Sequence, residues 1–213
     1  MTSPTLYSVP LGTKPRTKQR RRFVFGAAMV LMLTISLASR AGAYVLADVD
    51  IPDTYNLNGH TLVLNGAGLR TLTLLKIKAY IVALYLPKQS HDPEAILASP
   101  GPKVLVLYYI HSGTKEQVQD RYREGERVNC GGGGCDTSLQ GDFDRLVNAV
   151  IPVSPGDKTT YVITDKTFRA DTNGHELASF NDPRLGNMII NGFIGPHAPS
   201  EELRAGVLGL PPP

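Results

Sequence analysis

The feature that most restricts the fold of this chain is a long run of strand-forming residues, TLTLLKIKAYIVALYL, at positions 71–86. Its first half alternates between polar and apolar side chains, and its second half is apolar almost without interruption. Alternation is typical of a strand with one exposed face, whereas a continuous apolar run is typical of a strand covered on both faces. We therefore expect one long strand over residues 71–86, bulged near Leu74 and Leu75, in a sheet that other elements cover.

Arg70 stands between a flexible Gly-Ala-Gly segment and this apolar run. A buried guanidinium that has lost its partner costs about 3–5 kcal/mol. Arg70 must therefore meet an anionic or polar group, or else extend its charged end to water along an apolar stem. The residue pattern leaves both interpretations open.

Turn and capping signals divide the rest of the chain into short elements. Asn-Gly pairs, which favour tight turns, occur at residues 58–59, 65–66 and 173–174. Helix-opening signals occur at Asp92-Pro93, Thr114 with Gln117, Asp182-Pro183 and Ser200. Strands dominate the first part and helices cluster late, which predicts an α+β domain with a mainly antiparallel sheet and helices against one face.

The first 43 residues have the three parts of a secretory signal peptide. Lysines and arginines crowd residues 14–22, an apolar run follows at 23–39, and Ala-Gly-Ala ends the segment. The run is short for a membrane span, which needs about 20 residues. We expect cleavage after Ala43 and a periplasmic or secreted location; an uncleaved anchor, which would be the sole membrane contact, stays open. The sequence RRRFV also permits twin-arginine export.

The charge of the remaining chain excludes one class of partner. The whole chain carries a formal net charge of +3, but residues 1–43 hold seven lysines and arginines and no acid, so residues 44–213 carry −4. A mildly acidic body lacks the basic surface that nucleic-acid binding requires. We expect residues 44–210 to form one domain with a frayed tail at 211–213.

Cys130 and Cys135 are the two cysteines of the chain, and they flank four glycines. In an exported protein this spacing predicts a disulfide that closes a glycine loop. Zinc needs two further ligands, and the histidines show no paired spacing, so no metal is expected. Phosphate-loop, dinucleotide and nucleophile-elbow motifs are missing from the sequence as well, and no cofactor is predicted.

Several motifs together resemble the chalcone isomerase family, in particular its bacterial, exported, chalcone-isomerase-like branch. They are LNGAGLRT, KIKAYIVALYLP, EAILASPGPKVLVLYY, MIINGFIG and ELRAGVLG. The resemblance implies an open-faced sandwich, in which a large antiparallel sheet carries a helical layer on one face and a ligand cleft lies between them.

The resemblance also implies a role for Arg70. In the plant enzymes, an arginine at this place stabilises the anionic oxygen as a chalcone closes to a flavanone. In the fatty-acid-binding relatives, it holds a carboxylate together with a tyrosine, which corresponds here to Tyr80. Thr114 occupies the place of the plant catalytic tyrosine, and Arg121 that of a helical asparagine. Two or three plant catalytic partners are therefore missing, and Arg121 is expected to be a solvated helix charge.

We therefore expect a non-catalytic protein that binds a small apolar molecule with an anionic end, such as a fatty acid. Arg70, Tyr80 and Thr114 are the predicted ligand-binding residues. One alternative is an intramolecular lyase acting on a chalcone or related enone, with Arg70 as its catalytic residue. A second alternative is a structural protein of the cell envelope that binds no ligand.

Overall fold

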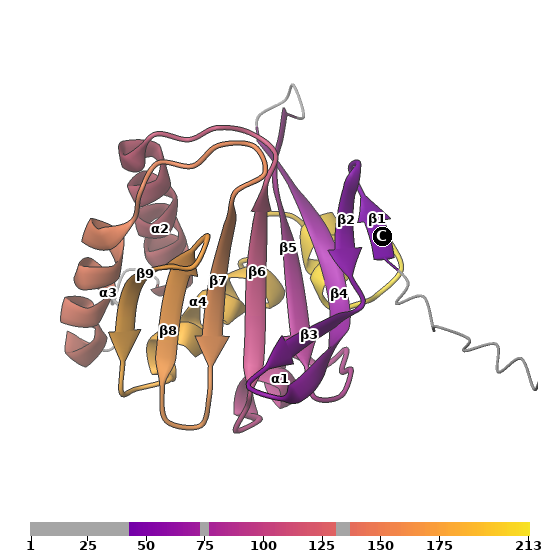
Figure 1. Ribbon diagram of the computed structural model, residues 1–213. Coiled ribbons are helices and arrows are strands. Elements are labelled where there is room, and N and C mark those ends of the chain that lie inside the picture. The colour runs from indigo at the N-terminus through magenta and orange to yellow at the C-terminus, as the bar shows by residue number, and fades with distance from the viewer. Residues whose placement is uncertain (1–42, 73–76, 131–136) are drawn as a thin grey trace, which may run out of the picture. The chain divides into compact units, whose positions relative to one another are not determined.

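A computed structural model describes residues 43–72, 77–130 and 137–213 (Figure 1). Strands β3 to β9 form one seven-stranded sheet in chain order, with every neighbouring pair antiparallel. Strands β1 and β2 form a separate hairpin. The predicted signal peptide lies outside the described residues except for Ala43, where β1 begins.

The elements have these bounds. The strands are β1 (Ala43–Leu46), β2 (Val49–Pro52), β3 (Thr54–Leu57), β4 (His60–Leu72), β5 (Ile77–Leu86), β6 (Lys103–Tyr109), β7 (Lys158–Ile163), β8 (Phe168–Thr172) and β9 (His175–Phe180). The helices are α1 (Pro93–Ala98), α2 (Lys115–Cys130), α3 (Thr137–Ala149), α4 (Arg184–Ile194) and α5 (Glu201–Val207). In the part of the chain that is described, no helix is long and apolar enough to cross a membrane.

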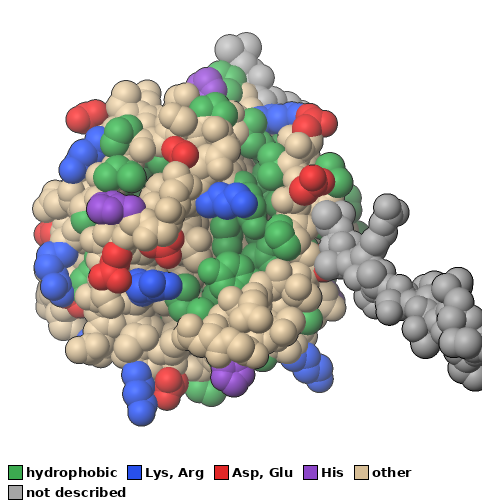
Figure 2. All heavy atoms as spheres, viewed as in Figure 1, with side chains coloured by type: hydrophobic (Ala, Val, Ile, Leu, Met, Phe, Trp, Pro, Cys, Tyr) green, Lys and Arg blue, Asp and Glu red, His purple; other side chains and the backbone are tan. Residues whose placement is uncertain are grey.

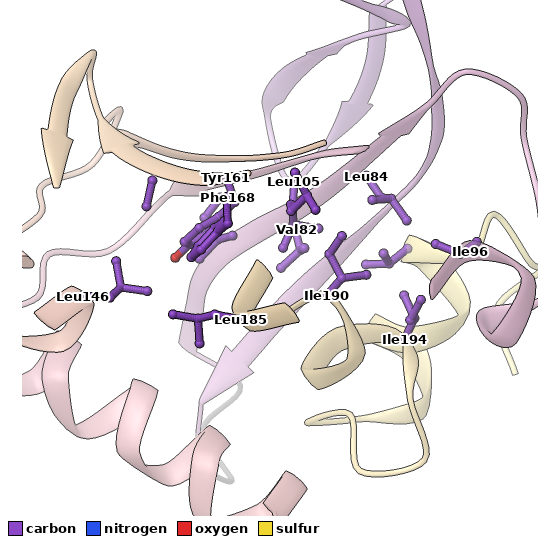
Figure 3. Packing of buried hydrophobic residues seen from close by; sticks show 14 of the residues in the cluster. Val82, Leu84, Ile96, Leu105, Leu146, Tyr161, Phe168, Leu185, Ile190 and Ile194 are labelled. Atoms are coloured by element: carbon purple, nitrogen blue, oxygen red, sulfur yellow. The ribbon is translucent and has the colours of Figure 1, made fainter. Parts of the chain in front are cut away.

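The main core lies between the sheet and the helices, which confirms the predicted α+β architecture (Figure 1). Leu185 and Ile190 of α4 point toward Val82, Leu105 and Tyr161 of the central strands (Figure 3). These side chains are almost completely buried. Burial of one such side chain is worth about 1.5–3 kcal/mol, so this layer holds the helices against the sheet.

The opposite face of the sheet is partly covered as well. Ile51 of β2 packs into a second buried cluster with Leu62, Ile81 and Tyr85. The hydroxyl of Tyr85 donates to the backbone carbonyl of Pro52 at 3.0 Å, which ties the hairpin to β5. On the face that Figure 2 displays, hydrophobic side chains gather in a strip right of centre. The prediction that the second half of the apolar run is covered on both faces is confirmed.

One predicted strand is in fact part of a hairpin. Residues 71–86 do not form one strand, because β4 ends at Leu72 and β5 begins at Ile77; the predicted bulge at Leu74 and Leu75 lies outside the described residues. Two adjacent strands of one sheet show the same alternation as one long strand, so the pattern hides a chain reversal. As a consequence, Arg70 lies within β4, directly opposite Tyr80 of β5.

The Asn-Gly pairs behave in two ways. Residues 58–59 and 173–174 form tight turns, and all four have positive φ, as that turn type requires. Asn65 and Gly66 instead lie inside β4, so the turn predicted there is wrong. The reason is tertiary: Gly66 faces the backbone of Gly206 and Gly209, and only a residue without a side chain fits against it.

The helix caps predicted at Asp92 and Ser200 are confirmed, whereas the N-cap of α4 is Pro183, which makes no side-chain capping hydrogen bond. Asp92 accepts a hydrogen bond from the Glu94 amide at 2.9 Å, and Ser200 accepts one from the Leu203 amide at 3.2 Å. Such a cap contributes about 1 kcal/mol to stability. Ser200 therefore fixes where α5 begins, and with it the position of the preceding residue, Pro199.

Candidate functional site

A cavity of about 420 Å³ lies between one end of the sheet and helices α2 and α4. That volume falls within the range of small-molecule sites. Side chains of β4, β5, β6 and β7 form the floor of the cavity, and α2 covers it. Helix α4 and the loop after it form one side. The residues that line the cavity include Arg70, Tyr80, Tyr109, Val118, Arg121, Tyr122, Gly125, Glu126, Asn129, Phe143, Tyr161, Met188, Ile189, Gly192, Phe193 and Pro199.

Polar residues cross the helix-facing side of the sheet in one row. Because side chains alternate between faces along a strand, residues that pair across strands share a face. Arg70 pairs with Tyr80, and Tyr80 pairs with Tyr109. The row continues through Thr159, whose hydroxyl donates to the Tyr109 oxygen at 3.4 Å, to Thr172. Toward the other end of the strands, the same face carries the apolar core, so the cavity is where the core stops.

Glycines in β4 set the place of Arg70. Gly66, Gly68 and Arg70 all face the helical layer, because they pair with alternate residues of β5. At the two glycines the backbone of α5 packs directly on β4. Arg70 comes next on that face, beyond the start of α5, and its guanidinium donates to the carbonyl of Pro199 at 3.3 Å. Among the described residues, no carboxylate forms an ion pair with it.

Tyr80 lies against this guanidinium. Burial raises the pKa of the Tyr80 phenol, while the charges of Arg70 and Arg121 and a hydrogen bond from Arg70 lower that pKa in part. Burial also raises the pKa of Tyr109 to about 12. Both phenols therefore stay protonated at neutral pH and can donate a hydrogen bond to a bound anion.

Helix α2 covers the cavity and touches the core only through two partly buried side chains, Val118 and Tyr122. It contains no buried residue in all its length. Its inward face presents Val118, Arg121, Tyr122 and Gly125 to the cavity, at the spacing of one helical face. The helix is attached through hydrogen bonds, including one between the hydroxyls of Tyr122 and Tyr161.

The predicted site residues are only partly brought together. Arg70 and Tyr80 both line the cavity. Thr114 does not line it. Thr114 is exposed at the start of α2, where its hydroxyl accepts a hydrogen bond from the backbone N–H of Gln117 at 3.3 Å in a capping box. Cys130 ends α2, and Cys135 lies outside the described residues, so the disulfide stays a prediction.

Sequence reasoning missed the contribution of α2. Arg121, expected to be a solvated charge, is exposed but also lines the cavity, and its charge acts on Tyr80. The spacing of Val118, Tyr122, Gly125 and Asn129 could have indicated one shared face. The charged residues between them masked that signal. Where the structure is described, no group of three or more histidines, cysteines or acids is arranged to hold a metal.

Comparison with known proteins identifies a structural neighbour and the family of this chain. A crystal structure of an Arabidopsis thaliana fatty-acid binding protein superposes with a TM-score of 0.64 at 15% sequence identity, covering 78% of this chain and 96% of that one. A search of curated proteins finds no significant match. The sequence profile of the chalcone isomerase-like family matches residues 43–209, which is most of the chain. The chain therefore belongs to the chalcone isomerase-like family.

Proposed function

We propose that this protein binds a small amphiphile with an anionic end, without transforming it. The observation that carries the proposal is the guanidinium of Arg70, which faces an apolar-walled cavity with a carbonyl and a phenol as its polar neighbours. A carboxylate of the ligand would complete the set, because the planar guanidinium can donate two parallel hydrogen bonds to it.

The cavity walls suit an apolar body behind that head group. Phe143 of α3 and Met188, Ile189 and Phe193 of α4 line the cavity from the helical layer. Methionine adapts to ligands of varied shape, and phenylalanine buries a large apolar area. The structural neighbour named above is described as a fatty-acid binding protein, which supports a fatty acid as the first ligand to try.

Binding is favoured over catalysis by the place of Thr114. The raised pKa values of Tyr80 and Tyr109 keep both phenols protonated at neutral pH, so that they can donate hydrogen bonds to a bound anion. Thr114, at the position of the plant catalytic tyrosine, points its hydroxyl into a helix cap. These phenols donate to an anion that is already formed.

The test is a calorimetric titration of the full-length chain with dodecanoate, dodecanol and methyl dodecanoate. We expect dodecanoate to bind at least about tenfold more tightly than the two uncharged molecules, since a charge-assisted hydrogen bond contributes about 1.5–3 kcal/mol. Equal affinity for all three would show that the guanidinium meets no ligand anion. Chalcone cyclisation above the spontaneous rate would instead support the lyase alternative.

Arg121 provides a further prediction about the head-group end. Replacing Arg121 with glutamine is expected to weaken dodecanoate binding by about threefold, a smaller loss than at a buried site because this side chain is exposed and screened. The loss should shrink at high salt. The control is Arg123→Gln. Arg123 follows Tyr122 on the same helix but does not line the cavity, and it forms an exposed ion pair with Asp144 at 3.4 Å. Equal losses in both variants would contradict a local role.

We also propose that residues 1–43 direct export and that the domain works outside the cytoplasm. The basic cluster and the apolar run that follows support this. Intact mass spectrometry of protein from an exporting host tests it: loss of residues 1–43 is expected. A full-length mass in the membrane fraction would favour the anchor, and a full-length mass in the cytosol would contradict export.

A further inference from the structure

Two glycines inside helices line the cavity although close packing does not require them. Gly125 lies within α2 and Gly192 within α4, and both border the cavity. Glycine is, after proline, the least favourable residue in the interior of a helix, so its presence there needs a cause. Close packing is the cause at Gly186 of α4, where an ideal Cβ would lie 2.5 Å from Cγ1 of Ile163. It is not the cause at Gly125 or Gly192.

The missing side chain of Gly125 would extend into the cavity. Gly125 follows Arg121 by four positions and Tyr122 by three, so it lies on the helical face that those two residues share. That face is directed inward, because Tyr122 packs against the main core and the charge of Arg121 acts on Tyr80. An ideal Cβ on Gly125 would nevertheless meet no other part of the molecule within 4 Å. Open space on the inward face of this helix is the cavity itself.

Gly192 opens the cavity at the same place from the side of α4. An ideal Cβ there would meet Asn129 Nδ2 at 3.5 Å, an ordinary van der Waals contact, so alanine would fit. The same nitrogen donates to the Gly125 carbonyl at 2.9 Å. Because one atom touches both positions, the two glycines are neighbours across the boundary between α2 and α4. Two absent side chains therefore add to one and the same space.

We propose that Gly125 and Gly192 select the ligand by the length of its tail. The space that they leave takes the tail of a long-chain anionic amphiphile, which runs between α2 and α4. This inference rests on the proposed function, because it takes the anionic end of the ligand to lie at Arg70. No atom of Arg70 lies within 4 Å of the Cβ position on Gly125, so this space is separate from the guanidinium. With the anionic end held there, any volume lost at the glycines is lost to the tail.

The experiment titrates octanoate and dodecanoate into the full-length wild type and its Gly125→Leu variant by calorimetry. Leucine adds as many carbon atoms as separate dodecanoate from octanoate. The wild type is expected to bind dodecanoate at least about a hundredfold more tightly than octanoate, since each buried methylene contributes about fourfold. In Gly125→Leu this preference should fall below about tenfold, because dodecanoate loses affinity while octanoate loses far less. Gly125→Ala and Gly192→Ala should shift the preference in the same direction by less, and they serve if leucine perturbs folding.

Gly141→Leu is the matched control. Gly141 lies within α3 and does not border the cavity, and a Cβ added there meets nothing within 4 Å. This variant should keep the full preference for dodecanoate. The inference would be overturned by equal binding of the two acids to the wild type, by a preference that survives in Gly125→Leu, or by an equal loss of both acids in that variant; each result leaves the proposed function intact. If neither acid binds to the wild type, the proposed function fails together with the inference.

Discussion

Replacing Gly66 with alanine is expected to lower the free energy of unfolding by about 3 kcal/mol, the upper range for overpacking a tight interior. An ideal Cβ on Gly66 would lie 2.5 Å from the Gly209 nitrogen and 2.8 Å from the Gly209 Cα, and closer still to the Gly206 carbonyl oxygen. These are backbone atoms, so no side-chain rotation can relieve the contact. Helix α5 would have to move away from β4.

Denaturant unfolding of Gly66→Ala measures this loss, and Gly141→Ala provides the matched control. Gly141 lies within α3, and a Cβ added there meets nothing within 4 Å. Alanine is favoured over glycine inside a helix by about 1 kcal/mol, so the same substitution should stabilise the protein at this position. Equal effects at both positions would show that the close contact of β4 with α5 does not hold the fold together.

Replacing Arg70 with glutamine is expected to weaken the binding of a carboxylate amphiphile by about a hundredfold, with little change in thermal stability. The loss combines the charge of the guanidinium with its hydrogen bonds to an anion, together about 3 kcal/mol. Stability should hold, because in the free protein the partners of the guanidinium among the described residues are one backbone carbonyl at 3.3 Å and the Tyr80 phenol. Titration calorimetry and thermal unfolding measure the two effects separately.

The control for this variant is Arg169→Gln, a second strand arginine. Arg169 lies exposed on β8 opposite Val162 and outside the cavity, so its loss removes the same charge without touching the site. Dodecanoate affinity should be unchanged in this variant. A stability loss at Arg70 with unchanged affinity would assign that arginine to folding, as the ligand-free alternative requires.

Local signals in the sequence predicted most elements of the fold. Capping residues such as Asp92 and Ser200 act within one helical turn, and the Asn173-Gly174 turn is equally local, so each could be identified without the tertiary structure. The hairpin of β4 and β5 was missed because two paired strands show the same alternation as one long strand. Asn65-Gly66 was misassigned because the close approach of α5, which comes from the far end of the chain, decides its conformation.

The candidate site was predictable only where a motif carried it. Arg70 and Tyr80 were identified through the family resemblance, and the structure places both in one cavity. Arg121 was not identified, because an arginine on a charged helix shows its role only once the helix is seen to cover a cavity. Thr114 was chosen by position alone, and its hydroxyl belongs to the helix cap.

The most direct test of the central claim is to identify what the purified protein carries. The full-length chain and its Arg70→Gln variant are expressed side by side, confirmed to be folded, denatured and extracted with organic solvent, and the extracts are compared by mass spectrometry. Our account predicts an anionic amphiphile in stoichiometric amount with the wild type and its loss from the variant. An identical amphiphile content in both proteins, or a wild type that carries none and binds no added dodecanoate, would contradict it.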